Sequence, residues 1–271
     1  ATPALLPPGA TNGSAMSGNG TYFVLSHAAS PYISIYKETA GVYVKLPTVS
    51  SLPPSGASDC AMPNSGDYLT VTPTGAGISV CWSSDSNYLT LTHAGAPFIT
   101  SYSRSGDTFT HMTAPAVTPP AATSSCALSG DGTYMVITYG VTPFLTIYKR
   151  SGNQYVALPT PSVFPSGAPT GVSFSENGVF LAVSNSLTPF LILYDRVGDI
   201  FNDINLPVPN PSTAITGCSY SKSGKFLTLS FSATPFLDIW KRTGITFALL
   251  PALADPPTVA ANSLTFAGDG R

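Results

Sequence analysis

The sequence predicts an all-β fold, and three observations carry that prediction. Short apolar runs alternate with turns along the whole chain, and no segment has helical periodicity of useful length. Gly and Pro account for 24 and 26 of the 271 residues, as expected where turns are frequent. One motif also recurs at a fixed spacing, because the prolines that open it, at positions 97, 143, 189 and 235, lie 46 residues apart. A period of this length indicates repeats that are stacked or arranged radially.

One complete unit of the repeat shows four strands separated by turns. In the unit that starts near residue 168, apolar runs at 172–174, 180–183, 190–194 and 201–206 are expected to be strands. The first two are joined at Asn177-Gly178, which is a strong signal for a hairpin turn. Four antiparallel strands per unit, repeated around an axis, are typical of a β-propeller, in which each unit is one blade.

The first strand of the unit can be counted seven times. Its equivalent positions are 46 residues apart, with one spacing of 20: Ser14, Cys60, Val80, Cys126, Val172, Cys218 and Leu264. Complete units are expected near 10–55, 76–121, 122–167, 168–213 and 214–259, with partial units at 56–75 and 260–271. We therefore expect a single propeller domain with six or seven blade positions, seven being favoured, and one truncated blade. Because an unpaired strand edge promotes association, self-association through the C-terminal strand is a further expectation.

The motif itself resembles a known family of repeats. In its clearest copy it reads SGDGTYM at 129–135 and TPFLTIYKRSG at 142–152, and it ends with Leu158-Pro159. This pattern is similar to the WD40-like propeller repeats of bacteriophage structural proteins, from about Gly9 to Gly270. The resemblance implies a virion component, associated with tail or capsid, that binds other virion proteins and has a structural role.

Antiparallel strands divide the connections of each blade between two faces. The loops between second and third strands share one face with the proline-rich linkers between blades. On that face one position varies while the sequence around it repeats, and a variable residue on a fixed scaffold is where binding specificity can lie. The candidate binding residues at this position are His27, His93, Tyr139, Asn185 and Phe231. They leave open the alternative of a carbohydrate-binding or host-surface adhesion propeller, with a surface glycan as partner.

The sequence carries no recognisable catalytic or cofactor motif. None of the three histidines, at positions 27, 93 and 111, has a second ligand at metal-binding spacing, and no nucleophile elbow or phosphate-binding loop is present. The carboxylates close to strands, Asp59, Asp195, Asp203 and Asp238, occupy unrelated places in their repeats. We therefore expect no enzymatic activity, no catalytic residue, no cofactor and no metal.

Aromatic residues recur at two positions of the repeat. The first set is Tyr36, Tyr102, Tyr148, Tyr194 and Trp240, and the second is Tyr43, Phe109, Tyr155, Phe201 and Phe247. Because they keep the same register in successive units, we expect them to form the packing layer between neighbouring blades. Three of the four cysteines (60, 126 and 218) are also equivalent, which indicates small buried side chains rather than disulfides.

Composition restricts the partners and the setting of the chain. The net charge of −2 gives no electrostatic attraction for nucleic acid, and no run of 18 apolar residues predicts membrane insertion. Charged residues make up 9% of the chain, well below the roughly 25% of ordinary soluble domains. A surface of Ser, Thr, Asn, Gly and Pro suits a virion, or alternatively an extracellular setting.

Overall fold

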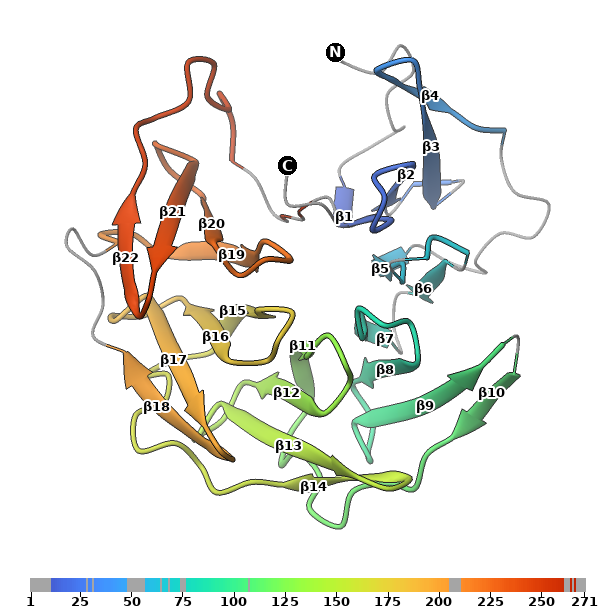
Figure 1. Cartoon of the computed structure of the whole chain (residues 1–271), viewed down its shortest axis with the longest axis vertical. Coiled ribbons are helices and arrows are strands. Elements are labelled where there is room, and N and C mark those ends of the chain that lie inside the picture. Colours follow the sequence, from blue (N-terminus) through green and yellow to red (C-terminus); the bar gives the residue numbers. More distant parts are fainter. Residues whose placement is uncertain are drawn as a thin grey trace.

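The computed structural model describes residues 11–27, 29–30, 32–47, 57–63, 65–67, 69–73, 77–106, 108–204, 211–260, 264 and 266. The strands in this part of the chain form five four-stranded antiparallel sheets and one two-stranded sheet, arranged around a common centre (Figure 1). The prediction of an all-β propeller with one truncated blade is confirmed, with five complete blades.

We number the blades along the chain. Blade 1 holds β1 (Thr11–Met16), β2 (Tyr22–His27), β3 (Ile33–Thr39) and β4 (Val42–Lys45), and the truncated blade 2 holds β5 (Ala57–Ala61) and β6 (Thr70–Pro73). Blade 3 holds β7 (Gly77–Trp82), β8 (Tyr88–His93), β9 (Ile99–Ser105) and β10 (Thr108–His111). Blade 4 holds β11 (Thr123–Leu128), β12 (Tyr134–Tyr139), β13 (Leu145–Ser151) and β14 (Gln154–Ala157). Blade 5 holds β15 (Pro169–Phe174), β16 (Phe180–Asn185), β17 (Leu191–Val197) and β18 (Ile200–Ile204). Blade 6 holds β19 (Ile215–Tyr220), β20 (Phe226–Phe231), β21 (Leu237–Thr243) and β22 (Thr246–Leu249).

The first strand of every blade is innermost, and it carries the same irregularity. In blade 5 the pairing passes from Pro169↔Asn185 to Gly171↔Ser184, so that one extra residue lies between the two pairs. The same bulge occurs at the start of β1, β5, β7, β11 and β19. A bulge of this kind bends the strand and re-aims its side chains. It also explains why β15 begins three residues before the predicted 172–174.

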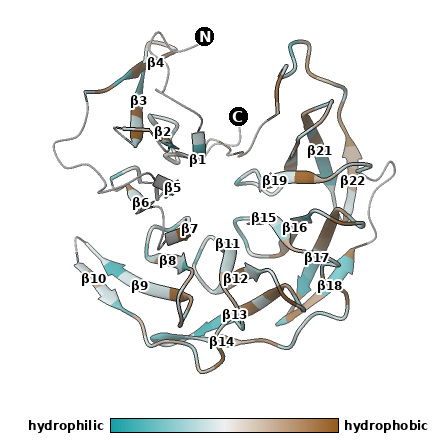
Figure 2. Cartoon of the chain, turned by 180° about the vertical axis from the view of Figure 1, so that it is seen from behind, coloured by the Kyte–Doolittle hydropathy of each residue, from teal (hydrophilic) through white to brown (hydrophobic). Residues whose placement is uncertain are grey.

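Neighbouring blades pack through their apolar faces. Leu145 and Ile147 of β13 lie in one core cluster with Val172, Leu181 and Tyr194 of blade 5. Figure 2 shows hydrophobic residues along the middle strands of blades 4 to 6, such as β17. The aromatic residues of blades 4 to 6 are buried in this layer, in agreement with the expected packing role.

The expected seventh position lies almost wholly outside the described residues. Beyond residue 260 only Leu264 and Phe266 are described, and Leu264 lies at the centre of the ring beside the innermost strands. The choice between six and seven positions, and self-association through the C-terminal strand, therefore stay predictions. All four cysteines are free thiols, as expected. In the described part of the chain no helix has the length and apolar character needed to cross a bilayer.

Candidate functional site in the central cavity

The innermost strands enclose a cavity of about 230 Å³ at the centre of the ring. Each complete blade contributes residues from the bulged start of its first strand, and these residues are mostly small and hydroxylated. The lining includes Ser58, Ser79, Ser124, Ser125, Thr170 and Thr216. Six hydroxyl-bearing side chains around one cavity offer both donors and acceptors to a polar ligand.

Several of these hydroxyl groups are held in place by the second strand of their own blade. The Ser124 hydroxyl lies 2.8 Å from the Thr138 hydroxyl, and the Thr216 hydroxyl lies 2.9 Å from the Ser230 hydroxyl. The Thr170 hydroxyl donates 2.6 Å to the carbonyl of Ile215 in the next blade. The wall of the cavity is therefore a fixed set of polar atoms.

Asp59 supplies the one carboxylate among the described residues that line the cavity. Its Oδ1 accepts a hydrogen bond of 2.8 Å from the Cys60 amide. Its Oδ2 accepts hydrogen bonds of 3.0 Å from both the Ser79 hydroxyl and the Val80 amide. Contacts among the described residues then use three of the four acceptor positions of the carboxylate, and the fourth is on Oδ1. These contacts also tie the truncated blade 2 to β7 of blade 3.

The surroundings of Asp59 raise the pKa of its carboxyl group. Burial is the largest cause, and the hydrogen bonds from Val80, Ser79 and Cys60 oppose it. A glycine is needed opposite, because a Cβ at Gly13 would come within about 2.5 Å of the Asp59 Oδ1 atom. The site therefore contains a partly desolvated carboxylate, and the absence of a side chain at Gly13 leaves space for its Oδ1 atom.

The thiols near the cavity are unsuited to nucleophilic chemistry. Burial, together with the Asp59 carboxylate, raises the pKa of the Cys60 thiol to about 12. Burial raises the pKa of Cys218, which lines the cavity, to about 11. The thiolate is the reactive form of cysteine, so both residues are inert at neutral pH. No group of three or more His, Cys, Asp or Glu side chains in the described ranges is placed to hold a metal ion.

The candidate binding residues of the loop face lie elsewhere, each at the last position of the second strand of its blade. His27 is fully buried, with Nδ1 2.7 Å from the Ala29 carbonyl and Nε2 3.1 Å from the Ser34 hydroxyl. His93 makes the corresponding contacts to the Gly95 carbonyl, at 2.7 Å, and to the Thr100 hydroxyl, at 3.1 Å.

Tyr139 and Asn185 hold the loops that follow them in the same way, through side-chain hydrogen bonds. The Tyr139 hydroxyl donates 2.8 Å to the Leu145 carbonyl, and the Asn185 amide nitrogen donates 2.7 Å to the Pro189 carbonyl. Phe231 is buried in the core of blade 6. The five residues are not brought together by the fold, and their role in binding stays a prediction.

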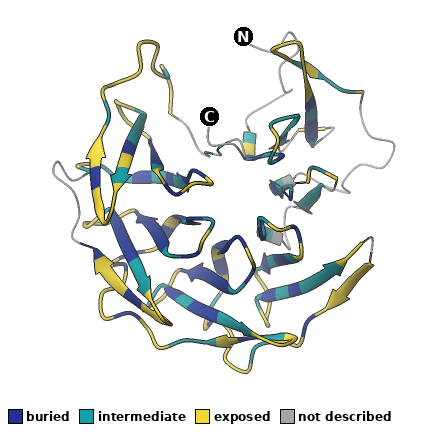
Figure 3. Ribbon diagram, viewed as in Figure 1, coloured by how far each residue is buried: buried dark blue, intermediate teal, exposed yellow. Residues whose placement is uncertain are grey.

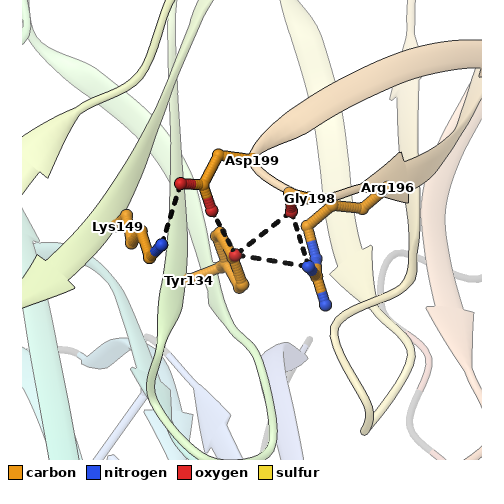
Figure 4. Close-up of polar contacts among 5 residues, drawn as sticks. All are labelled: Tyr134, Lys149, Arg196, Gly198 and Asp199. Carbon is orange, nitrogen blue, oxygen red and sulfur yellow. Dashed lines mark hydrogen bonds and ion pairs between the residues drawn. The ribbon is translucent and has the colours of Figure 1, made fainter.

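A second polar cluster lies between blades 4 and 5 on the opposite face (Figure 4). Lys149 Nζ forms an ion pair of 2.8 Å with Asp199 Oδ2, and the Tyr134 hydroxyl donates 2.6 Å to Asp199 Oδ1. Arg196 Nη1 donates to the Tyr134 hydroxyl, at 3.2 Å, and to the Gly198 carbonyl, at 2.7 Å. Because each charge has a partner within the cluster, we assign it a structural role between the blades.

Sequence reasoning missed the central site, although a signal for it was present. Asp59 lies one residue before Cys60, at a position occupied elsewhere by Gly13, Ser79 and Ser125. In the seven-copy register this is the one carboxylate among small residues. This signal is visible only when Asp59 is compared with its equivalents in the other repeats, and not with carboxylates at unrelated positions.

Comparison with known proteins shows the fold. No protein-family model matches the chain, and no curated protein matches it in sequence. Among solved structures, a protein from Bacteroides fragilis described as a candidate 6-phosphogluconolactonase is similar with a TM-score of 0.67 and 13% identity, covering 89% of this chain and 82% of its own. A second such candidate, from Bacteroides uniformis, has a TM-score of 0.66 and 14% identity, covering 89% and 83%. Hydrazine synthase from Kuenenia stuttgartiensis has a TM-score of 0.71 and 12% identity, covering 96% and 90%.

These likenesses correct the functional expectation. The variable loop position left open a carbohydrate-binding or adhesion propeller, and the repeat motif predicted a structural virion component. That expectation is wrong, because the similar propellers described above are named for enzymes and none of them is named for a phage, tail or capsid. The motif identified the propeller correctly, since repeat signatures reflect the packing of blades, and packing does not determine function.

Proposed function

We propose that this chain is a small-molecule hydrolase whose site is the central cavity, with Asp59 as general base. The observation that carries the proposal is the Asp59 carboxylate, which lines the cavity, has one acceptor position that no described residue occupies, and has a pKa raised by burial. A carboxylate with a raised pKa is a stronger base than an ordinary one, and it takes a proton from water more readily near neutral pH.

The lining of the cavity favours an uncharged, hydroxyl-bearing lactone or ester as substrate. Fixed hydroxyl groups such as those of Ser124 and Thr216 match the hydroxyl groups of such a compound. The structural likeness to candidate 6-phosphogluconolactonases supports a lactone. A phosphate group is usually held by Arg, Lys or a helix N-terminus, and none of the described residues that line the cavity is Lys, Arg or His. The substrate we propose is therefore unphosphorylated.

The proposed step is a base-assisted hydrolysis. Asp59 takes a proton from a water molecule while the water oxygen bonds to the carbonyl carbon of the substrate. The ester C–O bond then breaks, and Asp59 returns the proton to the departing alkoxide. The products are a carboxylic acid and an alcohol, and the Asp59 carboxylate is regenerated. The three hydrogen bonds to Asp59 keep the base in position through both transfers.

The test is hydrolysis of glucono-δ-lactone and related unphosphorylated aldonolactones by the purified chain, measured against the spontaneous rate. We expect Asp59→Asn to lower the enzymatic rate by about 10²-fold or more. The matched control is Asp203→Asn, which makes the same change at an exposed carboxylate on β18, far from the cavity. The wild-type rate is expected to fall as the pH drops through the pKa of Asp59.

Two results would overturn the proposal. One is a lactone half-life in the presence of the chain equal to that in buffer. The other is an enzymatic rate that Asp59→Asn leaves unchanged, because the base must then be a different residue. Thermal unfolding of the Asp59→Asn variant shows whether a lost rate reflects lost chemistry or a lost fold.

A further inference from the structure

The truncated blade 2 leaves the facing side of blade 3 less covered than its equivalents. Blades 4, 5 and 6 each follow a complete blade, whereas blade 3 follows the two-stranded sheet β5–β6. The second aromatic position of the repeat shows the effect. Phe109 is 38% exposed, whereas the equivalent Tyr155, Phe201 and Phe247 are 1%, 5% and 7% exposed.

The other positions on this side of blade 3 agree. Tyr102 is partly exposed, although the equivalent Tyr148, Tyr194 and Trp240 are buried. Figure 3 shows β10 exposed along its length, while β14, β18 and β22 each include at least one buried residue. The difference follows from the missing third and fourth strands of blade 2, since the apolar residues of those strands cover the next blade elsewhere in the ring.

This more exposed side of blade 3 forms an apolar groove of about 310 Å³ beside β6. Leu69, Leu89 and Leu91 line it together with Trp82, Tyr102 and Phe109. The rings of Trp82 and Phe109 pack edge to face, with centroids 5.9 Å apart. Trp82 Nε1 donates 3.2 Å to the Thr70 hydroxyl of β6, which ties the groove to the edge of the truncated blade.

The groove continues an interface that is already established within the chain. Blades 2 and 3 are packed together through β5 and β6 against β7, and the groove extends this packing outward to β9 and β10. Among the described strands, β6 pairs with β5 alone, so its other edge is where a third strand lies in a complete blade. A strand edge beside apolar pockets is the arrangement that binds an extended peptide by strand addition.

We propose that this groove and the outer edge of β6 form a docking site for an extended segment of another polypeptide, with aliphatic side chains at alternate positions. The third strands of the complete blades indicate that aliphatic side chains at alternate positions fit such a surface. Leu145 and Ile147 of β13, and Leu191 and Leu193 of β17, lie two residues apart and pack on the following blade. The incoming segment pairs with β6 through its backbone and places its aliphatic side chains against Trp82 and Phe109.

The probe is a fluorescently labelled peptide with the sequence of residues 142–158, which contains β13 and β14. Binding to the full chain is measured by fluorescence anisotropy. The emission of Trp82 gives a second readout, because the chain has two tryptophans and Trp240 is already buried in blade 6. We expect saturable binding and a blue shift of the Trp82 emission as the peptide excludes water from the groove.

Matched variants assign the binding to the groove. Phe109→Asp is expected to weaken peptide binding at least about tenfold, a loss typical of an interface residue that carries binding energy. Ile200→Asp, at a 67% exposed position on β18, is expected to leave the affinity unchanged. A peptide with Asp in place of Leu145 and Ile147 is expected not to bind.

Three results would overturn the proposal. The first is the absence of saturable binding to a chain whose unfolding transition is normal. The second is equal binding to the wild type and to Phe109→Asp. The third is a dimer in light scattering that Phe109→Asp converts to monomer, because the occupant is then a second copy of this chain. None of these outcomes depends on lactone hydrolysis, so this inference and the proposed function can fail separately.

Discussion

Arg196 of blade 5 lies over the ring of Tyr134 of blade 4, with its Cζ atom 4.3 Å from the ring centre. Arg150 lies in the same way over Tyr88, at 4.3 Å, and Arg242 over Phe180, at 3.9 Å. In each case an arginine from a third strand reaches back to the start of the second strand of the preceding blade. The repeat therefore carries a cation–π contact that joins successive blades.

The first prediction concerns this contact. Arg196→Lys is expected to lower the free energy of unfolding by about 1–2 kcal/mol. The lysine ammonium group can neither stack on the Tyr134 ring as a plane nor make the forked hydrogen bonds of the guanidinium group. Urea unfolding measures the change. Lys241→Ala, at an exposed position of β21, is the control and is expected to change stability by less than about 0.5 kcal/mol. Equal effects of the two substitutions would show that the contact between Arg196 and Tyr134 does not contribute measurably to stability.

The second prediction compares two glycines with the same backbone conformation. Gly132 and Gly152 both have positive φ, at 65° and 59°. A Cβ at Gly132 would overlap the ring of Tyr88 in blade 3, and Arg150 of blade 4 packs against the same ring. A Cβ at Gly152 meets nothing within 4 Å. Gly152→Ala is expected to cost about 1 kcal/mol from backbone strain alone. Gly132→Ala is expected to cost clearly more, by denaturant unfolding, and a cost equal to that of Gly152→Ala would contradict the overlap.

The third prediction is a pair of pH dependences with opposite sign. Burial raises the folded-state pKa of Asp59, so its contribution to stability is full below the ordinary carboxyl pKa of about 3.9 and is lost as the pH rises through the raised value. Hydrogen bonds from Lys149 and Tyr134 lower the pKa of Asp199, so its contribution is present above the ordinary pKa and is lost as the pH falls.

Unfolding free energies between about pH 3 and pH 7 test both signs. Relative to the Asp59→Asn variant, the wild type is expected to lose stability as the pH rises. Relative to Asp199→Asn, it is expected to gain stability as the pH rises. If the stability difference between wild type and variant changed with pH in the same direction for both carboxylates, the stated environment of one of them would be wrong.

The fourth prediction concerns His27, the last residue of β2 in blade 1. His27→Ala is expected to destabilise the fold by about 2–3 kcal/mol, because it leaves the loop carbonyl of Ala29 and the buried hydroxyl of Ser34 without their partner. His111→Ala, at an exposed position of β10, is the matched control. Thermal unfolding separates the two variants, and an unchanged transition for His27→Ala would contradict the stabilising role of its two hydrogen bonds.

Much of the architecture follows from the sequence alone. The 46-residue spacing, the hairpin at Asn177-Gly178 and the short unit at 56–75 predict four-stranded blades and one truncated blade. The hairpin and the short unit are local, since each depends on residues within one repeat, and the spacing compares equivalent positions along the chain. A period-two apolar pattern and a turn residue specify a strand and a hairpin wherever the blade lies in the ring.

The tertiary structure decided which side chains meet across repeats. The arrangement of the blades around a common centre brings Asp59 to the cavity, and a blade without its outer strands leaves Phe109 exposed although its sequence position matches that of the buried Tyr155. The same local pattern predicted His27 on the loop face, whereas the structure places it at the end of β2 and fully buried. Burial and contact depend on what the neighbouring blade supplies, and a repeat pattern describes each blade without its neighbour.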